Sequence, residues 1–366
     1  MLPRMNKSVH YLNTGLVIKR WMSILTLINT IIASIVSLCI IFYVLTIYLS
    51  KRDARKSFHV SLILTCNTCL TIICSCIIFG LMALSSLAGD CNYASLQWII
   101  SWNCYFRGYL VNVFLTSIYL SYIIQAAYRL LRIVYHKHKY LRRMSTFSYY
   151  IVMQWALAFI VSLPMLIRSK TYSSMIIYLP DNFNCVVPFT NICATTYSVI
   201  SVYLSPLFGL CFIYFRIIIH LKSERRRRPS IPLKFRRQNK RDKSVITRIY
   251  LVIFVLCGLG LPTIIFYLLY VLTDQLHWTT YRLSFLSISI SFVFISLSSL
   301  YVTPQIYKRI RTICSCSRSA KKNSCLSYSI SINIEREKKM ESILLENTTI
   351  ADPNLLSLFQ WVRSSC

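Results

Sequence analysis

Residues 58–84 read FHVSLILTCNTCLTIICSCIIFGLMAL and contain no Asp, Glu, Lys or Arg. A helix needs about 20 apolar residues to cross a hydrocarbon core of roughly 30 Å, since each residue adds about 1.5 Å. Irregular backbone cannot face lipid, because its N–H and C=O groups would lack hydrogen-bond partners. This stretch therefore predicts a membrane-spanning helix.

Six further apolar runs share this pattern. They cover residues 21–49, 96–134, 147–167, 192–221, 245–272 and 283–302, and all eleven acidic residues lie outside the runs. Together with residues 58–84 they predict an all-α membrane protein, a seven-transmembrane helix bundle within residues 21–304. An extracellular N-terminus is expected at 1–20, a short amphipathic helix 8 at 305–316, and a disordered cytoplasmic tail at 317–366.

The composition supports this class and excludes others. Hydrophobic residues make up 55% of the chain, charged residues 14%, and the mean hydropathy is +0.54. The net charge of +30 would suggest nucleic acid in a soluble protein, but the cations lie between the apolar runs, so no nucleic-acid partner is expected. The runs and their flanks show no paired carboxylates, no nucleophile with a base and no metal-ligand cluster. We therefore expect no enzyme activity, no cofactor and no metal.

Basic loops set the orientation, because cytoplasmic loops are enriched in Lys and Arg. Three alternate loops are basic, with cations at 51, 52, 55 and 56, then at 132, 137, 139, 142 and 143, then at 225–228. The intervening segments are poor in cations, since 85–97 has none and 273–283 has only Arg282. We expect a multi-pass plasma-membrane protein with its N-terminus extracellular and its C-terminus cytoplasmic. The triplet Asn6-Lys7-Ser8 agrees and makes Asn6 a candidate glycosylation site.

The fifteen cysteines fall into groups with different expectations. Cys91, Cys104, Cys185 and Cys193 lie in or beside the expected outer loops, where an oxidising environment favours a disulfide bridge. Four more crowd residues 66–76 and are interpreted as small packing residues rather than metal ligands. Cys314 and Cys316 follow a basic amphipathic stretch, which makes them candidate palmitoylation sites.

Several landmarks recur at defined spacings. Cys104 and Arg129 are 25 residues apart, about 38 Å along a helix, so they lie at opposite membrane interfaces. Trp155 precedes Pro164 by nine residues, and Pro206 precedes Tyr214 by eight. Pro262 interrupts the sixth run, and Thr303-Pro304-Gln305-Ile306-Tyr307 closes the seventh. Over residues 20–316 this ordered series resembles the rhodopsin-like (class A) G-protein-coupled receptors, in particular their divergent invertebrate orphan type.

The resemblance implies a disulfide between Cys104 and Cys185 and coupling to a heterotrimeric G protein. It also shows where the chain departs from the family. Tyr128-Arg129-Leu130 stands in place of Asp/Glu-Arg-Tyr, and Leu259-Gly260-Leu261-Pro262 in place of Cys-Trp-x-Pro. The aspartate of the family's second span is missing, and Asn67 is the nearest polar candidate.

An activation mechanism follows from prolines and inner-face polar groups. Pro206, Pro262 and Pro304 each remove a backbone hydrogen bond and are the expected helix hinges. Arg129, Tyr214 and Tyr307 are the expected switch, exchanging partners between closed and open bundles. Because residue 128 is not acidic, we expect a weak resting lock and appreciable ligand-independent signalling, or alternatively no coupling at all.

The expected ligand pocket lies in the outer half of the bundle. Its candidate residues are Arg107, Asn112, Thr116, Tyr203 and Tyr267. This mildly cationic, aromatic and hydroxyl-bearing set suits a peptide or a small anionic or neutral molecule, whereas a biogenic amine would need a carboxylate partner. The other expected partners are anionic membrane lipid at 225–228 and an arrestin-like regulator binding the serine-rich tail.

Two other classes of function remain open. A transporter or channel is also helical and polytopic, but such proteins usually show internal repeats and intramembrane charges. A seven-helix decoy that no longer couples is the second alternative. Loss of signalling on replacement of Arg129, at normal surface expression, would distinguish a coupling receptor from a decoy.

Overall fold

The computed structural model describes residues 3–50, 60–91, 102–135, 144–166, 175–227 and 232–302. Within these ranges, seven helical spans are long and apolar enough to cross a membrane. This confirms the predicted seven-transmembrane bundle. The predictions for Pro304, Tyr307, residues 305–316, Cys314, Cys316 and the tail fall outside the described residues, and so does the side chain of Asn6.

The elements follow the order of the predicted spans. The helices are α1 (Pro3–Ser50), α2 (Val60–Asp90), α4 (Trp102–Ile133), α5 (Met144–Leu166), α6 (Ile192–Ser198), the π-helix η3 (Val199–Leu204), α7 (Ser205–Arg227), α8 (Pro232–Thr273) and α9 (Thr280–Val302). Two short strands, β1 (Ile177–Leu179) and β2 (Asn184–Val186), form an antiparallel hairpin between α5 and α6. The span predicted at 192–221 therefore consists of α6, η3 and α7 in succession.

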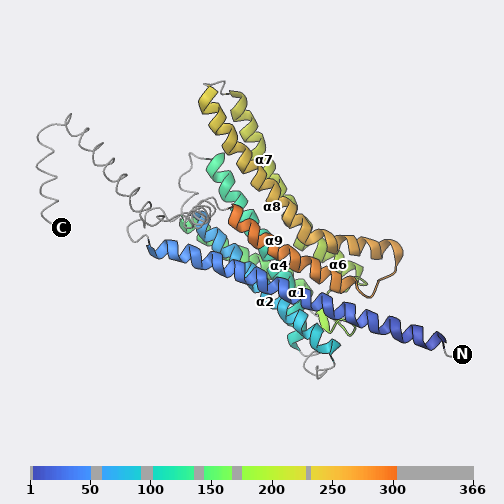
Figure 1. The fold of residues 1–366 in the computed structure, drawn as a ribbon. Coiled ribbons are helices and arrows are strands. Elements are labelled where there is room, and N and C mark those ends of the chain that lie inside the picture. The colour runs from blue at the N-terminus through green and yellow to red at the C-terminus, as the bar shows by residue number, and fades with distance from the viewer. Residues whose placement is uncertain are drawn as a thin grey trace, which may run out of the picture. The chain divides into compact units, whose positions relative to one another are not determined.

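The helix α4 is the central element of the bundle. It packs against α2, α5 and α7, while α1 lies beside α2 and α9, and α8 lies between α7 and α9 (Figure 1). Of the most apolar window of α4, 61% of residues are buried, compared with 22% for α5. The buried side chains of α4 include several that bear a hydroxyl group, and Tyr119 and Tyr122 are each 2% exposed. The centre of the bundle is thus partly polar, whereas large apolar side chains such as Phe254 of α8, 78% exposed, face outward as lipid contact requires.

Two helices include charged residues that are expected in outer loops from the sequence. The helix α2 continues to Asp90, and α9 begins at Thr280 and includes Arg282. The expectation that all acidic residues lie outside the spans is therefore wrong for Asp90. The physical reason is that Asp90 and Arg282 form an ion pair at 3.1 Å, which allows both charges to lie within helices. The sequence alone does not show that two charges 192 residues apart are partners.

The π-helical segment η3 precedes Pro206. The N–H of Ser205 donates to the carbonyl of Ile200, five residues earlier, in place of the α-helical bond four residues back. Pro206 lacks an N–H and its ring crowds the carbonyl of residue 202, which explains the wider turn at this point. Val202 and Tyr203, in the same segment, are both buried, 0% and 5% exposed.

Candidate functional site

The disulfide marks one end of the bundle, here called the Cys104 end; the other is the Arg129 end. Cys104 of α4 is bonded to Cys185 of β2, with their Cα atoms 5.4 Å apart. This confirms the pairing implied by the family resemblance, and Cys91 and Cys193 remain free thiols. A Cβ at Gly108 would lie 2.6 Å from the Cys185 carbonyl oxygen, so glycine lets the strand lie directly on α4.

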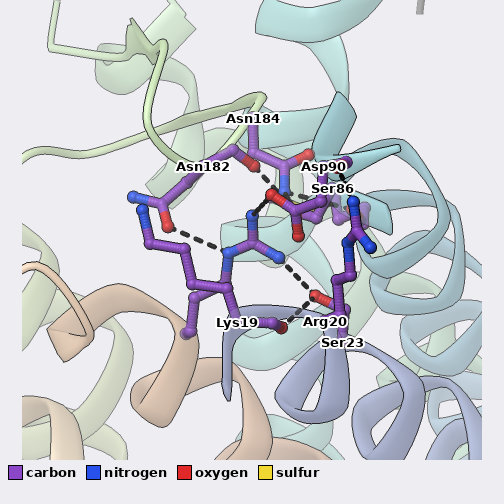
Figure 2. A network of polar contacts seen from close by, with 9 residues as sticks. Lys19, Arg20, Ser23, Ser86, Asp90, Asn182 and Asn184 are labelled. Atoms are coloured by element: carbon purple, nitrogen blue, oxygen red, sulfur yellow. Dashed lines mark hydrogen bonds and ion pairs between the residues drawn. The ribbon is translucent and has the colours of Figure 1, made fainter. Parts of the chain in front are cut away.

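A polar cluster at the Cys104 end joins the hairpin to three helices (Figure 2). We call it the Arg282 cluster. Its members are Lys19, Arg20 and Ser23 of α1, Ser86 and Asp90 of α2, Asn182 and Asn184 of the hairpin, and Arg282 of α9.

The guanidinium of Arg282 has partners on three other segments. Its Nη2 donates to Asp90 Oδ1 at 3.1 Å, its Nε donates to Asn182 Oδ1 at 3.0 Å, and its Nη1 donates to Ser23 Oγ. The side chains of Arg282 and Asp90 are each 2% exposed. Burial of an ion costs several kcal/mol unless it is paired and hydrogen-bonded. These partners therefore allow a guanidinium in the interior.

A second set of hydrogen bonds fixes the hairpin itself. Ser86 Oγ donates to the Asn182 carbonyl at 2.8 Å, and Asn184 Nδ2 donates to Ser86 Oγ at 2.6 Å. On the far side of the cluster, Arg20 Nη2 donates to the Asp90 carbonyl at 2.7 Å, close to the negative end of the α2 dipole. The hairpin is thus held on one side by the disulfide to α4 and on the other by α2 and α9.

The five ligand-pocket candidates lie in four places. Asn112 and Thr116 lie together on α4, where Thr116 Oγ1 donates to the Asn112 carbonyl and Ser198 Oγ of α6 donates to Asn112 Oδ1 at 3.2 Å. Tyr203 lies deeper, against Tyr119.

The other two candidates contact different helices. Tyr267 of α8 shares a hydrogen bond of 2.6 Å with Thr196 Oγ1 of α6. Arg107 turns away toward α2, donating to Ser85 Oγ at 2.7 Å and to the carbonyl of Asn103. The structure therefore brings the neutral candidates to the α4, α6 and α8 side and separates Arg107 from Asn112 and Thr116.

In the middle of the bundle, buried amides connect α2, α4 and α5. Asn67 Nδ2 donates to Gln154 Oε1 at 2.8 Å, and Asn67 Oδ1 accepts from Trp155 Nε1 at 3.1 Å. Gln154 Nε2 in turn donates to Ser117 Oγ at 3.0 Å. Asn67 therefore serves as a contact to α5.

At the Arg129 end, two predicted switch residues meet. Arg129 Nη1 of α4 donates to the hydroxyl of Tyr214 of α7 at 3.3 Å. Arg129 is half-buried, and Tyr214 is 1% exposed. Tyr128, where the family has an acid, packs edge-to-face on Phe147 of α5 with ring centroids 5.2 Å apart. The residue before the arginine thus supplies an aromatic contact to α5 where the family has a carboxylate.

The sequence profile of the seven-transmembrane receptors of the rhodopsin family matches residues 65–307. The chain belongs to the rhodopsin family of seven-transmembrane receptors. A search of curated proteins finds no match. Proteins of this family span the membrane several times, are generally not enzymes, and generally act with a heterotrimeric G protein.

Sequence reasoning missed part of this rhodopsin-family receptor's polar interior. Asp90 and Arg282 were assigned to loops, and Gln154 was not singled out. A signal existed for the first pair, because Asp90 lies six residues after the run at 58–84 and Arg282 directly before the run at 283–302, so both segments reach the same membrane interface. Gln154 had a weaker signal, an amide next to the landmark Trp155 in a run otherwise free of amides.

Proposed function

We propose that this receptor binds an extracellular ligand at the Cys104 end and activates a heterotrimeric G protein at the Arg129 end. The observation that carries the proposal is the hydrogen bond between Arg129 and Tyr214, which joins α4 to α7 at one end of the bundle. Family membership supplies the general partner. In this proposal the protein lies in the plasma membrane with its N-terminus outside.

The contact has the character of a switch. A single hydrogen bond between a guanidinium and a neutral phenol contributes about 0.5–3 kcal/mol, which is small enough to be exchanged for another partner. Tyr307 is the proposed alternative partner, and Pro206, Pro262 and Pro304 are the proposed hinges. No acid precedes Arg129 at position 128, so we expect measurable ligand-independent signalling.

The ligand is proposed to bind on the α4, α6 and α8 side, near Asn112, Thr116, Tyr203 and Tyr267. These residues offer amide and hydroxyl groups beside aromatic rings, which supports a peptide or a small neutral molecule. Arg107 extends the proposed site toward α2, where it would contact an anionic group. Glycosylation at Asn6, palmitoylation at Cys314 and Cys316, anionic lipid at 225–228 and an arrestin-like regulator complete the proposal.

The test compares two arginines of α4. Arg129→Ala removes the donor to Tyr214, whereas Arg132→Ala removes an exposed arginine three residues further along the same helix. Each variant carries an N-terminal epitope tag, which antibody on intact cells detects only if that end is outside. G-protein nucleotide exchange is then measured per tagged receptor at the surface.

We expect Arg129→Ala to abolish ligand-independent exchange and Arg132→Ala to leave most of it. Equal activity in both variants and in the parent, at equal surface levels, would favour the non-coupling decoy instead. An ion current or solute flux across the membrane that needs the protein but no G protein would favour the transporter or channel.

A further inference from the structure

The middle of α8 contains the weakest stretch of helix in that span. Residues 258–262 read Gly-Leu-Gly-Leu-Pro. Pro262 has no N–H, so the carbonyl of Gly258 loses its usual helical partner, and each glycine lowers helix stability by about 0.5–1 kcal/mol relative to alanine. The helix nevertheless runs without interruption from Pro232 to Thr273. Contacts from other helices must therefore support this stretch.

Two buried tyrosines supply such contacts. The hydroxyl of Tyr119, on α4, donates to the carbonyl of Leu256 at 2.9 Å. The ring of Tyr203, in η3, meets the ring of Tyr119 edge-to-face with centroids 5.9 Å apart. Both side chains are almost fully buried, 2% and 5% exposed. The pair thus links α4 and the π-helical segment to α8 just before Pro262.

The fit between this tyrosine pair and α8 depends on Gly260. A Cβ at position 260 would lie 2.8 Å from Tyr203 Cδ1 and 3.1 Å from the Tyr119 hydroxyl. A Cβ at Gly258, two residues earlier and on the opposite side of the helix, would meet only Ser291 Oγ, at an ordinary 3.9 Å. The tyrosines therefore pack against bare backbone at 260, in the space that a side chain would otherwise occupy.

We propose that Tyr119 and Tyr203 are positioning residues that hold the α8 hinge, residues 256–262, as continuous helix. Tyr203 is also a candidate pocket residue, so displacement of its ring by a ligand would release the hinge by direct contact. The proposal rests on the proposed function only in this last step. The support of the hinge by the two tyrosines is a property of the receptor alone.

The test measures backbone amide hydrogen exchange in the purified full-length receptor in lipid nanodiscs, without ligand. Tyr119→Phe removes only the hydroxyl that binds Leu256. Loss of one such hydrogen bond should raise exchange at residues 256–262 by about three- to tenfold, while exchange in α9 stays unchanged. A purely global loss of stability would instead raise exchange in α8 and α9 together, and that result would overturn the proposal.

Two glycine variants provide the matched steric comparison. Gly260→Ala should raise exchange at 256–262, because the new methyl group pushes Tyr203 and Tyr119 away. Gly258→Ala should leave exchange unchanged or lower it, because alanine favours the helix and nothing obstructs it. Adding Tyr203→Val to Gly260→Ala removes the clashing ring atoms and should bring exchange back toward that of Tyr203→Val alone. Equal effects of the two glycine variants would contradict the proposal.

G-protein nucleotide exchange on the same preparations separates this proposal from the proposed function. If the parent activates a G protein, Tyr119→Phe should alter its ligand-independent rate, since a looser hinge changes the balance of closed and open bundles. An unchanged rate with a loosened hinge would overturn the link to activation. A parent that activates no G protein would count against the proposed function, and the hydrogen-exchange comparison would still decide the role of the tyrosines.

Discussion

Two arginines at opposite ends of the bundle occupy contrasting environments. Arg282 is 2% exposed and donates to three side chains from α1, α2 and the hairpin. Arg129 is half-buried, and its hydrogen bond to Tyr214 spans 3.3 Å. A guanidinium with several acceptors on separate segments fixes those segments together, because moving any one of them breaks a buried charged contact. A guanidinium with a weak neutral acceptor remains able to change partner.

The largest expected effect is on the Arg282 cluster. Asp90→Asn keeps the size of the side chain but leaves Arg282 as a buried charge without a carboxylate, which should lower the free energy of unfolding by about 3–5 kcal/mol. The double variant Asp90→Asn with Arg282→Gln removes both charges and should be less destabilised than the single variant. Thermal unfolding of the receptor in detergent measures both. A double variant less stable than the single one would show that the ion pair is not the source of the effect.

The disulfide gives the next largest effect. Cys104→Ser should lower stability by about 2–4 kcal/mol, because it frees the hairpin from α4 and opens a covalent loop between residues 81 positions apart. Cys91→Ser is the matched control, since Cys91 is a free thiol near the same end of the bundle. Under non-reducing conditions both proteins are heated in the same buffer. A control as unstable as Cys104→Ser would mean that loss of a thiol, rather than of the bridge, is responsible.

The smallest expected effect on stability is at the Arg129 end. Tyr214→Phe removes one hydroxyl and should change the unfolding free energy by about 0.5–3 kcal/mol, the range for a single hydrogen bond to a guanidinium. If the pair acts as a switch, nucleotide exchange per surface receptor should fall more than this stability change explains. If Tyr214→Phe lowered the unfolding free energy as strongly as Asp90→Asn, the Arg129–Tyr214 contact would be a fixed support, and the contrast between the two ends would disappear.

Most of the fold can be predicted from local sequence. An uncharged run such as 58–84 is long enough to require a spanning helix. The charged loops between the runs mark where one span ends and the next begins. The Cys104–Cys185 pairing follows from the family resemblance. Arg129 and Tyr214 are expected to exchange partners because both are polar groups at the inner ends of their runs.

The remaining features depend on contacts between distant segments. Asp90 and Arg282 are separated by 192 residues, and each alone looks like the end of a span. The support of the α8 hinge requires knowing that Tyr119 and Tyr203 fill the space beside Gly260. The π-helical turn at 199–204 arises where a proline meets the crowded interior, and only the position of Pro206 is visible in the sequence.

The ion pair between Asp90 and Arg282 also has a consequence for biosynthesis. At about 5–20 residues per second, the ribosome needs roughly 10–40 s to make the 192 residues that separate the two charges. During that interval the Asp90 carboxylate has no Arg282 to pair with, and burial of an unpaired charge costs several kcal/mol. We therefore expect the two charges to be buried together only after α9 is made, and chains truncated before α9 to keep Asp90 exposed to water.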